Sequence, residues 1–189
     1  TLMLSDAEAI EKNIPLITGV AAQVYRSAQL KYGSKNTNTT VRGTGEQYLK
    51  LSNFTIERGR YFSKEEVRSI RKVAVIGSTV LKNLFGDSNA IGKKIKVSGN
   101  NYLIIGSTKP KGALSWFDPD DQIFIPVTTA QKRLFGLHLI QSIDVQAKQM
   151  EELEAIKTDI DVLLRVRHGI HDGEDSDYHV KSTSQWLKS

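Results

Sequence analysis

Four consecutive apolar residues, Val73–Ile76, constrain the fold of this chain most strongly, because a glycine and then a helical pattern follow them at once. A short unbroken apolar run indicates a strand that is covered on both faces, and therefore a central strand of a sheet. Gly77 predicts a tight turn out of that strand, and Ser78 is a residue type that caps helices. We therefore expect a helix over Thr79–Phe85, ended by Gly86.

The same order of strand, glycine and helix also begins many nucleotide-binding folds. A dinucleotide site needs further glycines at fixed spacing, and a P-loop ends in Gly-Lys followed by Ser or Thr, whereas this stretch reads GSTVLKNL. A second pair of glycines, Gly43 and Gly45, is followed by Tyr48 where a third glycine would stand. Both stretches favour ordinary turns over a phosphate site.

Helical patterns occur near both ends of the chain. A helix is predicted over Ser5–Asn13, with Ser5 or Asp6 as its cap, and a longer one over Met150–Arg167, whose apolar residues recur on one face. Ser63 is expected to cap a short helical turn in the first half of the chain.

Short strands lie between these helices without a regular alternation of strand and helix. Gly59 and Gly92 are expected at turns, the latter leading into the next strand. Strands are predicted over residues 19–32, 39–43, 93–98, 101–107, 122–127, 141–148 and 178–182, and further helices over 46–53, 128–135 and from 184 onward. This pattern predicts an α+β fold of two packed modules rather than a doubly wound sheet.

The composition narrows the classes of protein without choosing among them. The chain has 189 residues, no cysteine and a net charge of +5. The absence of cysteine excludes disulfides, thiolate metal sites and cysteine nucleophiles. Because no run of about 18 apolar residues exists, no segment is predicted to span a membrane. The chain begins at Thr1 without a methionine, so we expect a piece of a longer protein whose targeting signals lie outside it.

Basic residues are scattered, and the one small group, Lys93, Lys94 and Lys96, suits the exposed edge of a sheet. Nucleic-acid binding would need basic residues interleaved with exposed aromatic residues, and aromatic residues make only 7% of this chain. We therefore predict no nucleic-acid partner.

An acidic loop carries three of the four histidines, His168, His171 and His179, in the phrase HGIHDGEDSDYH. Imidazole and carboxylate groups together can bind zinc or another divalent ion. The spacing matches neither a closed zinc site nor an EF-hand, and Asp-rich loops are usually solvated. We predict no metal site and no cofactor, and keep a free-standing metal- or ligand-binding module as an alternative.

No catalytic residue is predicted, because neither a G-x-S-x-G elbow nor an H-E-x-x-H motif is present. One long loop, TKPKGALSWFDPDD, carries the neighbouring aromatic residues Trp116 and Phe117. If they are exposed, they are candidates for contact with a partner or a membrane surface. The alternative, that they fold back over the local core, is equally compatible with the sequence.

Several phrases of this chain, taken in order, resemble the extracytoplasmic core domain of MacB-type ABC transporter permeases. They are GEQYLKLSNFTIERGRYFSKEEV, KVAVIGSTVLKNLFG, AIGKKIKVSGNNYLIIGSTKPKG, DDQIFIPVTTAQKRLFG and IQSIDVQAK. The phrase IDVLLRVRHGIHD resembles the Arg-His-Gly phrase that closes the long helix in MacB-type proteins. Each phrase alone is a weak signature, but their order and spacing together make the resemblance specific over nearly the whole chain.

The resemblance implies a periplasmic domain between the first and second transmembrane helices of a permease. It implies two subdomains: a porter-like βαβ module formed from residues 1–70 and 139–189, and an inserted, mainly β module of the type called Sabre over residues 71–138. The last helix would run on toward the membrane. The domain would be non-catalytic, with ATP hydrolysed by a separate nucleotide-binding domain.

The family also implies partners. MacB-type pumps act as homodimers with a periplasmic adaptor (MacA) and an outer-membrane duct (TolC), and export macrolides, peptides or similar substrates. Lipoprotein-release permeases and Gram-positive peptide exporters share the domain, and they remain an alternative. The isolated domain is expected to be a monomer or a weak dimer, because the membrane helices would supply most of the dimer contact.

Overall fold

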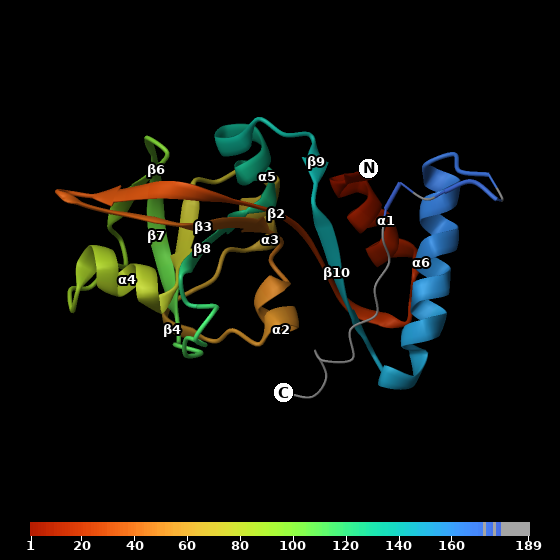
Figure 1. Ribbon diagram of the computed structural model, residues 1–189, viewed down its shortest axis with the longest axis horizontal. Helices are drawn as coiled ribbons and strands as arrows, with labels where there is room; N and C mark the ends of the chain where they lie inside the picture. Colours follow the sequence, from red (N-terminus) through yellow and green to blue (C-terminus); the bar gives the residue numbers. More distant parts are fainter. Residues whose placement is uncertain (172, 176, 179–189) are drawn as a thin grey trace.

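The computed structural model describes residues 1–171, 173–175 and 177–178. Its centre is a mixed eight-stranded sheet with the order β10-β2-β3-β8-β5-β7-β4, in which β6 pairs with both β2 and β7 (Figure 1). β1 and β9 form a small antiparallel ribbon of their own. The strands are β1 (Leu2–Met3), β2 (Ile17–Tyr32), β3 (Lys35–Thr44), β4 (Ile56–Gly59), β5 (Val73–Ile76), β6 (Lys94–Val97), β7 (Asn100–Thr108), β8 (Gln122–Pro126), β9 (Leu139–Ile140) and β10 (Ser142–Ala147).

The three longest helices lie at the two ends of this sheet, and α2, α3 and α5 lie between them (Figure 1). The two longest, α1 and α6, pack against each other at the β10 end, and α4 lies at the opposite end (Figure 1). The helices are α1 (Leu4–Asn13), α2 (Tyr48–Ser52), α3 (Lys64–Arg68), α4 (Ser78–Phe85), α5 (Val127–Thr129) with a π-helical turn over Ala130–Phe135, and α6 (Leu153–Arg167) preceded by a 3-10 turn over Met150–Glu152.

The fold is α+β with two subdomains, as predicted. We call the part built from α1, the first half of β2, β10 and α6 the helical subdomain. The part built from the second half of β2, from β3 to β8 and from α2 to α5 is the sheet subdomain. β4 and α3, which precede residue 70, lie with the sheet subdomain, since β4 pairs with β7 and α3 contacts α5. The predicted boundaries near residues 70 and 139 stay a prediction.

Strand β2 runs through both subdomains. Its residues up to Gln23 pair with β10, and its residues from Gln23 onward pair with β3. At its far end Leu30 and Lys31 also pair with β6. A strand of 16 residues is unusually long, and its shared pairing makes it the continuous backbone connection between the subdomains.

Each subdomain has an apolar core, and the two are in contact because Val127 of α5 and Val67 of α3, which belong to the sheet subdomain, pack in the core of the helical subdomain. In the sheet subdomain, α4 and the π-helical turn cover one face of the strands over residues such as Ile104, Ile123 and Tyr102, which are fully buried. In the helical subdomain, α1 and α6 cover β2 and β10 over Ile10 and Ile156. A third cluster, built around Phe124, lies under α2.

The Val73–Ile76 run is the buried central strand that its sequence predicts. β5 lies between β7, to which it is parallel, and β8, to which it is antiparallel, and all four residues are buried. Gly77 turns the chain because there is no room for a side chain: a Cβ atom would lie 2.4 Å from the carbonyl oxygen of Asp120 and 2.6 Å from that of Gln122.

The prediction that Ser78 caps α4 is wrong. The cap position is Gly77, and Ser78 is the first helical residue, buried and without a capping hydrogen bond. Other segments meet the start of this helix: the amide of Thr79 donates to the Asp120 carbonyl, and its hydroxyl donates to Asp118 Oδ2 at 2.6 Å. A side-chain cap is unnecessary where the neighbouring loop supplies acceptors.

The cap predicted for the first helix is wrong as well. α1 begins at Leu4, so Ser5 and Asp6 lie inside its first turn. Asp6 accepts a hydrogen bond from the amide of Met3 at 2.9 Å, which is the reciprocal half of a capping box rather than the cap itself.

The remaining turn and cap predictions agree with the structure. Ser63 caps α3 and accepts from the amide of Glu66. Gly86 ends α4, and Gly92 precedes β6. Gly59 has a φ of +71° where β4 ends, and a Cβ atom there would lie 2.2 Å from the Ile105 carbonyl oxygen. The strand predicted over 178–182 and the helix predicted from residue 184 lie outside the described residues, apart from Tyr178.

Candidate functional site: the cleft between the subdomains

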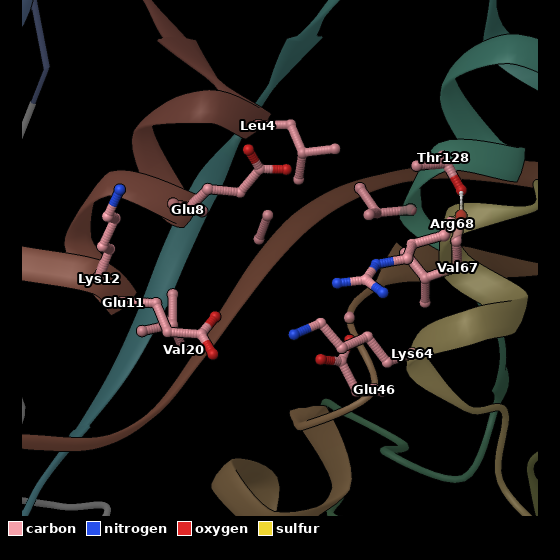
Figure 2. Close-up of a pocket in the computed structure, with 14 residues that line it drawn as sticks. Leu4, Glu8, Glu11, Lys12, Val20, Glu46, Lys64, Val67, Arg68 and Thr128 are labelled. Atoms are coloured by element: carbon pink, nitrogen blue, oxygen red, sulfur yellow. Dashed lines mark hydrogen bonds between the residues drawn. The ribbon is translucent and has the colours of Figure 1, made fainter.

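A cleft with a volume of about 660 Å³ separates α1 of the helical subdomain from α3 of the sheet subdomain (Figure 2). Its floor is apolar and belongs to both subdomains, with Val20 of β2 near one wall and Val67 and Val127 near the other. This volume falls within the range of small-molecule sites in proteins. The cleft is therefore large enough either to hold a ligand or to let the walls move toward each other.

The two walls differ in net charge. Glu8 and Glu11 stand on α1, and Lys64 and Arg68 stand on α3 (Figure 2), while each side also carries one charge of the other sign, Lys12 on α1 and Glu46 beside Lys64. Glu8, Glu11, Lys64 and Arg68 are exposed, and no ion pair within the described residues joins the two walls. Attraction between exposed opposite charges is weak at long range but grows as the charges approach. The charges thus favour a narrower cleft.

The basic wall is fixed to the sheet subdomain. Arg60 forms a bidentate ion pair with Glu66, at 2.6 Å for the shorter contact, and this pairing lowers the pKa of Glu66. The hydroxyl of Thr128 donates to the carbonyl of Val67, and that of Thr129 donates to the carbonyl of Arg71 at 2.7 Å. α3 therefore moves with α5 and the strand β8 before it.

One side chain connects the two subdomains beside the cleft. Gln47, just before α2, accepts a hydrogen bond from the amide of Val20 at 2.9 Å and donates to Glu11 Oε1 at 3.3 Å. Gln47 therefore ties the segment after β3 to both β2 and α1. Together with the continuous strand β2, it holds the two subdomains together beside the cleft.

A polar row crosses the sheet at the same junction. Arg42 of β3 donates to Gln122 at 2.8 Å and to Gln23 of β2, and Gln23 donates to Asp144 of β10. Burial raises the pKa of Asp144 to about 6, although Arg42 and Gln23 act in the opposite direction. This row joins strands of both subdomains through side chains as well as through the backbone.

The aromatic loop lies elsewhere, far from the first residues of the chain and from the end of α6 (Figure 1). Trp116 is 81% exposed and Phe117 50% exposed, and their rings stack with centroids 5.8 Å apart. The alternative that they fold back over the core is therefore wrong. Their role as a partner contact stays a prediction.

The aromatic loop is nevertheless well anchored. Asp120 is buried and accepts hydrogen bonds from the amides of Lys111 and Gly112, each at 2.9 Å. Leu114, which is 58% exposed, pairs with Phe117 through the backbone. The result is a defined apolar tip made of Leu114, Trp116 and Phe117, which we call the aromatic tip.

The histidine loop does not form a metal centre within the part of the chain that the structure describes. No group of three or more histidine and acidic side chains there has the arrangement of a metal site. His168 instead lies between Asp6 and Asp177, one carboxylate on each ring nitrogen. His179 lies outside the described residues.

Sequence reasoning did not identify the cleft. Its charged residues lie on short amphipathic helices and look like ordinary solvated surface positions. They become a site only because β2 and the segment around Gln47 bring α1 opposite α3. No local motif could have revealed that placement.

Comparisons with known proteins agree on one family. The family model described as the MacB-like periplasmic core domain matches residues 1–163. The macrolide export ATP-binding/permease protein MacB of Chlorobium luteolum is 36% identical over 171 residues, covering 90% of this chain and 26% of that protein. The protein of the same name from Bdellovibrio bacteriovorus is 35% identical, covering 89% of this chain and 26% of that protein. The chain thus spans about a quarter of the length of these relatives.

Solved structures share the fold. The periplasmic region of MacB from Actinobacillus actinomycetemcomitans superposes with a TM-score of 0.80 at 24% identity, covering 89% of this chain and 75% of that one. The extracellular domain of the ABC-type transporter YknZ from Gram-positive bacteria gives a TM-score of 0.79 at 19% identity, covering 90% and 86%. In the described residues of this chain, no helix is both long and apolar enough to cross a membrane.

Proposed function

Since the chain belongs to the MacB-like periplasmic core domain family, we propose that it serves as the motion-transmitting periplasmic part of an ABC export transporter. In this role the domain is non-catalytic and binds no cofactor. ATP would be hydrolysed by a separate nucleotide-binding domain, and flanking membrane helices would carry the resulting movement to the chain. The observation that carries the proposal is the family match over residues 1–163, together with relatives at 35–36% identity.

The cleft is the place where transmitted movement would change the shape of the domain. α1 and α6 belong to the helical subdomain, so a displacement of the chain ends acts on that subdomain first. The sheet subdomain is tied to it through β2, Gln47 and the polar row. A pivot at this junction would open or close the gap between α1 and α3, and it would shift the packing of Val127 and Val67 on the helical subdomain.

The aromatic tip is the proposed contact for the adaptor. It is exposed, apolar, anchored by Asp120 and remote from both the start of α1 and the end of α6, whereas a membrane contact would be expected near the segments that lead to the membrane helices. Clustered exposed aromatic residues are typical anchors of protein interfaces. We propose a MacA-like adaptor as the partner, with a TolC-like duct beyond it and a homodimer of the full-length transporter. Macrolides, peptides or similar compounds would be the substrates.

The experiment uses the full-length transporter with the double substitution Trp116→Ala and Phe117→Ala. We expect adaptor affinity, measured by titration of the purified partners, to fall at least roughly tenfold, because the anchor is lost. Basal ATP hydrolysis should persist. Val162→Ala, which trims another exposed apolar side chain on α6, is the matched control and should leave adaptor affinity unchanged. Unchanged affinity in the double variant would contradict docking through the aromatic tip.

A second candidate is a Gram-positive or lipoprotein-release permease of the same superfamily. The likeness to the extracellular domain of YknZ, with a TM-score of 0.79, favours keeping it. The two candidates differ in whether an outer-membrane duct exists. Co-purification of the full-length transporter with an adaptor and a duct would favour the MacB-type pump, whereas co-purification with an adaptor alone would favour the Gram-positive type.

A further inference from the structure

The start of α1 and the end of α6 meet in a small cluster of charges. Asp6 lies in the first turn of α1, with only 3% of its side chain exposed. Arg167 donates from Nε to Asp6 Oδ1 at 2.9 Å, and His168 Nε2 lies 2.9 Å from Asp6 Oδ2. Arg167 and His168 are the last residue and the C-cap of α6. The buried carboxylate of Asp6 is thus in contact with two basic side chains at the end of α6.

His168 has a carboxylate at each of its ring nitrogens. Nε2 faces Asp6, and Nδ1 lies 2.7 Å from Asp177 Oδ1. A carboxylate oxygen only accepts, so both contacts are hydrogen bonds only when both ring nitrogens carry a proton, which makes the imidazole positively charged. A neutral ring would leave one nitrogen lone pair directed at a carboxylate. With both carboxylates ionised, the geometry therefore favours the doubly protonated imidazole.

We propose that His168 is a pH-sensitive latch: in its doubly protonated form it fastens the segment that follows α6 to the start of α1, and loss of a proton releases that segment. The latch joins residues 162 positions apart in the sequence. The inference depends on these contacts and not on the proposed function. Given that function, the latch would make α1 and α6 follow the movement of the chain ends as one body.

The neighbouring groups set the direction of the pH response. The hydrogen bond with Asp177 is the main cause that raises the pKa of His168, burial opposes it, and Asp6 adds to the rise. Tyr178 meets the ring edge-on, with centroids 5.6 Å apart and an angle of 87°. The amino group of Thr1 lies 3.0 Å from Asp177 Oδ2, and the His168 contact lowers the pKa of Asp177.

These pKa shifts set an upper and a lower pH limit for the stabilising effect of the latch. Because the folded-state pKa of His168 is raised, its stabilising effect is complete below about pH 6.5 and is lost as the pH rises through the folded-state value. Burial raises the pKa of Asp6, but hydrogen bonds from Arg167, His168 and Met3 outweigh burial and lower it. The effect of Asp6 is therefore complete above about pH 3.9 and is lost as the pH falls through its folded-state value.

The experiment follows the His168 ring by NMR through a pH titration of the 189-residue chain, with His168→Gln used to identify the signal. We expect a pKa above the ordinary value of about 6.5. Asp177→Asn and Asp6→Asn should each lower it toward that value. Asp175→Asn, which removes a negative charge from an exposed position of the same loop, is the matched control and should leave it near the wild-type value.

A second measurement shows whether protonation of His168 changes how firmly the start of α1 is held, and not only the charge nearby. The amide of Met3 donates to Asp6 Oδ2, so its hydrogen exchange reports whether the start of α1 is held. After correction for intrinsic rates, exchange at Met3 should speed up roughly tenfold once the pH passes the His168 pKa, and equally in His168→Gln at lower pH.

Because Asp6 is buried, the Asp6→Asn variant could fail to fold. The side chain of Asp177 is 42% exposed, so the Asp177→Asn variant is expected to fold and keeps the test decisive. An ordinary His168 pKa in the wild type would overturn the proposal. So would a His168 pKa that Asp177→Asn leaves unchanged, or Met3 exchange that does not depend on His168.

Discussion

The two subdomains differ in what closes their cores. The core of the sheet subdomain, from Val24 in β2 to Ile104 in β7, is built from apolar and aromatic side chains, and the one buried carboxylate nearby, that of Asp120, binds loop amides outside this core. The helical subdomain is apolar in the middle, around Ile156, but its α1 and α6 ends are joined by Asp6, Arg167 and His168. Apolar burial is non-directional and insensitive to pH, whereas charge-assisted contacts depend on pH.

Under the proposed function, this difference gives the subdomains different mechanical roles. A closely packed core moves as a rigid body. Helices joined at their ends by charges can be fastened or released without disturbing either core. The junction between them is polar too, through Gln47 and the row from Asp144 to Gln122. The apolar layers thus supply most of the folding stability, and the polar contacts are the ones that can break and re-form while the domain stays folded.

The largest effect is expected from removing apolar volume in the sheet subdomain. Ile104→Ala should lower the free energy of unfolding by about 3 kcal/mol, because Ile104 is fully buried and a cavity would remain. Urea denaturation at about pH 5 and about pH 9 should give the same loss, since no titrating group takes part. Ile156→Ala is the matched change in the other core. A loss for Ile104→Ala that varies strongly with pH would break the comparison.

His168→Gln should have a smaller effect that depends on pH. We expect a loss of about 1–2 kcal/mol at about pH 5 and almost none at about pH 9, because the raised pKa of His168 places its contribution on the acidic side. Chemical denaturation of the variant and the wild type across this range measures the difference. An equal loss at both pH values would mean that His168 acts by packing alone.

Asp144→Asn sharpens the comparison at the junction and should be stabilising. The pKa of Asp144 is about 6, above its unfolded value, so folding favours the protonated form and the ionised carboxylate costs stability above that pH. The variant should gain about 1–2 kcal/mol at about pH 8, and less at about pH 5. Thermal melting at both values tests this. Destabilisation of the variant at about pH 8 would show that Arg42 needs the ionised carboxylate of Asp144 as a partner.

The smallest effect is expected from Tyr102→Phe. Within the described residues the Tyr102 hydroxyl is buried without a hydrogen-bond partner, and burial raises its pKa to about 12. Removing an unsatisfied hydroxyl should leave stability unchanged or raise it by up to ~1 kcal/mol. A clear loss in a denaturant titration would reveal a polar contact in this core and weaken the contrast with the helical subdomain.

The parts of the fold that sequence alone predicted are those governed by local pattern. The run of Val73–Ile76 had to be a central strand, and Gly86 and Ser63 ended and began their helices as expected. The assignment of Ser78 as a cap failed because the deciding contacts come from Asp118 and Asp120, some 40 residues away.

The cleft and the latch lay beyond sequence reasoning for the same physical reason. Asp6 and His168 each looked like a local feature, one a helix cap and the other part of an acidic loop. Their meeting depends on α1 and α6 packing against each other. Whether Trp116 is exposed could not be predicted either, because its exposure depends on the loop conformation that the buried Asp120 holds.

Movement across the cleft is the central claim, and one distance tests it most directly. Lys12 on α1 and Glu65 on α3 are exposed, and changing them to cysteine for spin labels leaves the two glutamates of α1 and the two basic residues of α3 in place; the 189-residue chain has no other cysteine. In the full-length transporter, pulsed EPR should give different label distances with and without bound ATP, while a pair within the sheet subdomain, Lys82 and Lys96, stays constant. A distance from Lys12 to Glu65 that is the same in both states would contradict transmission through this cleft.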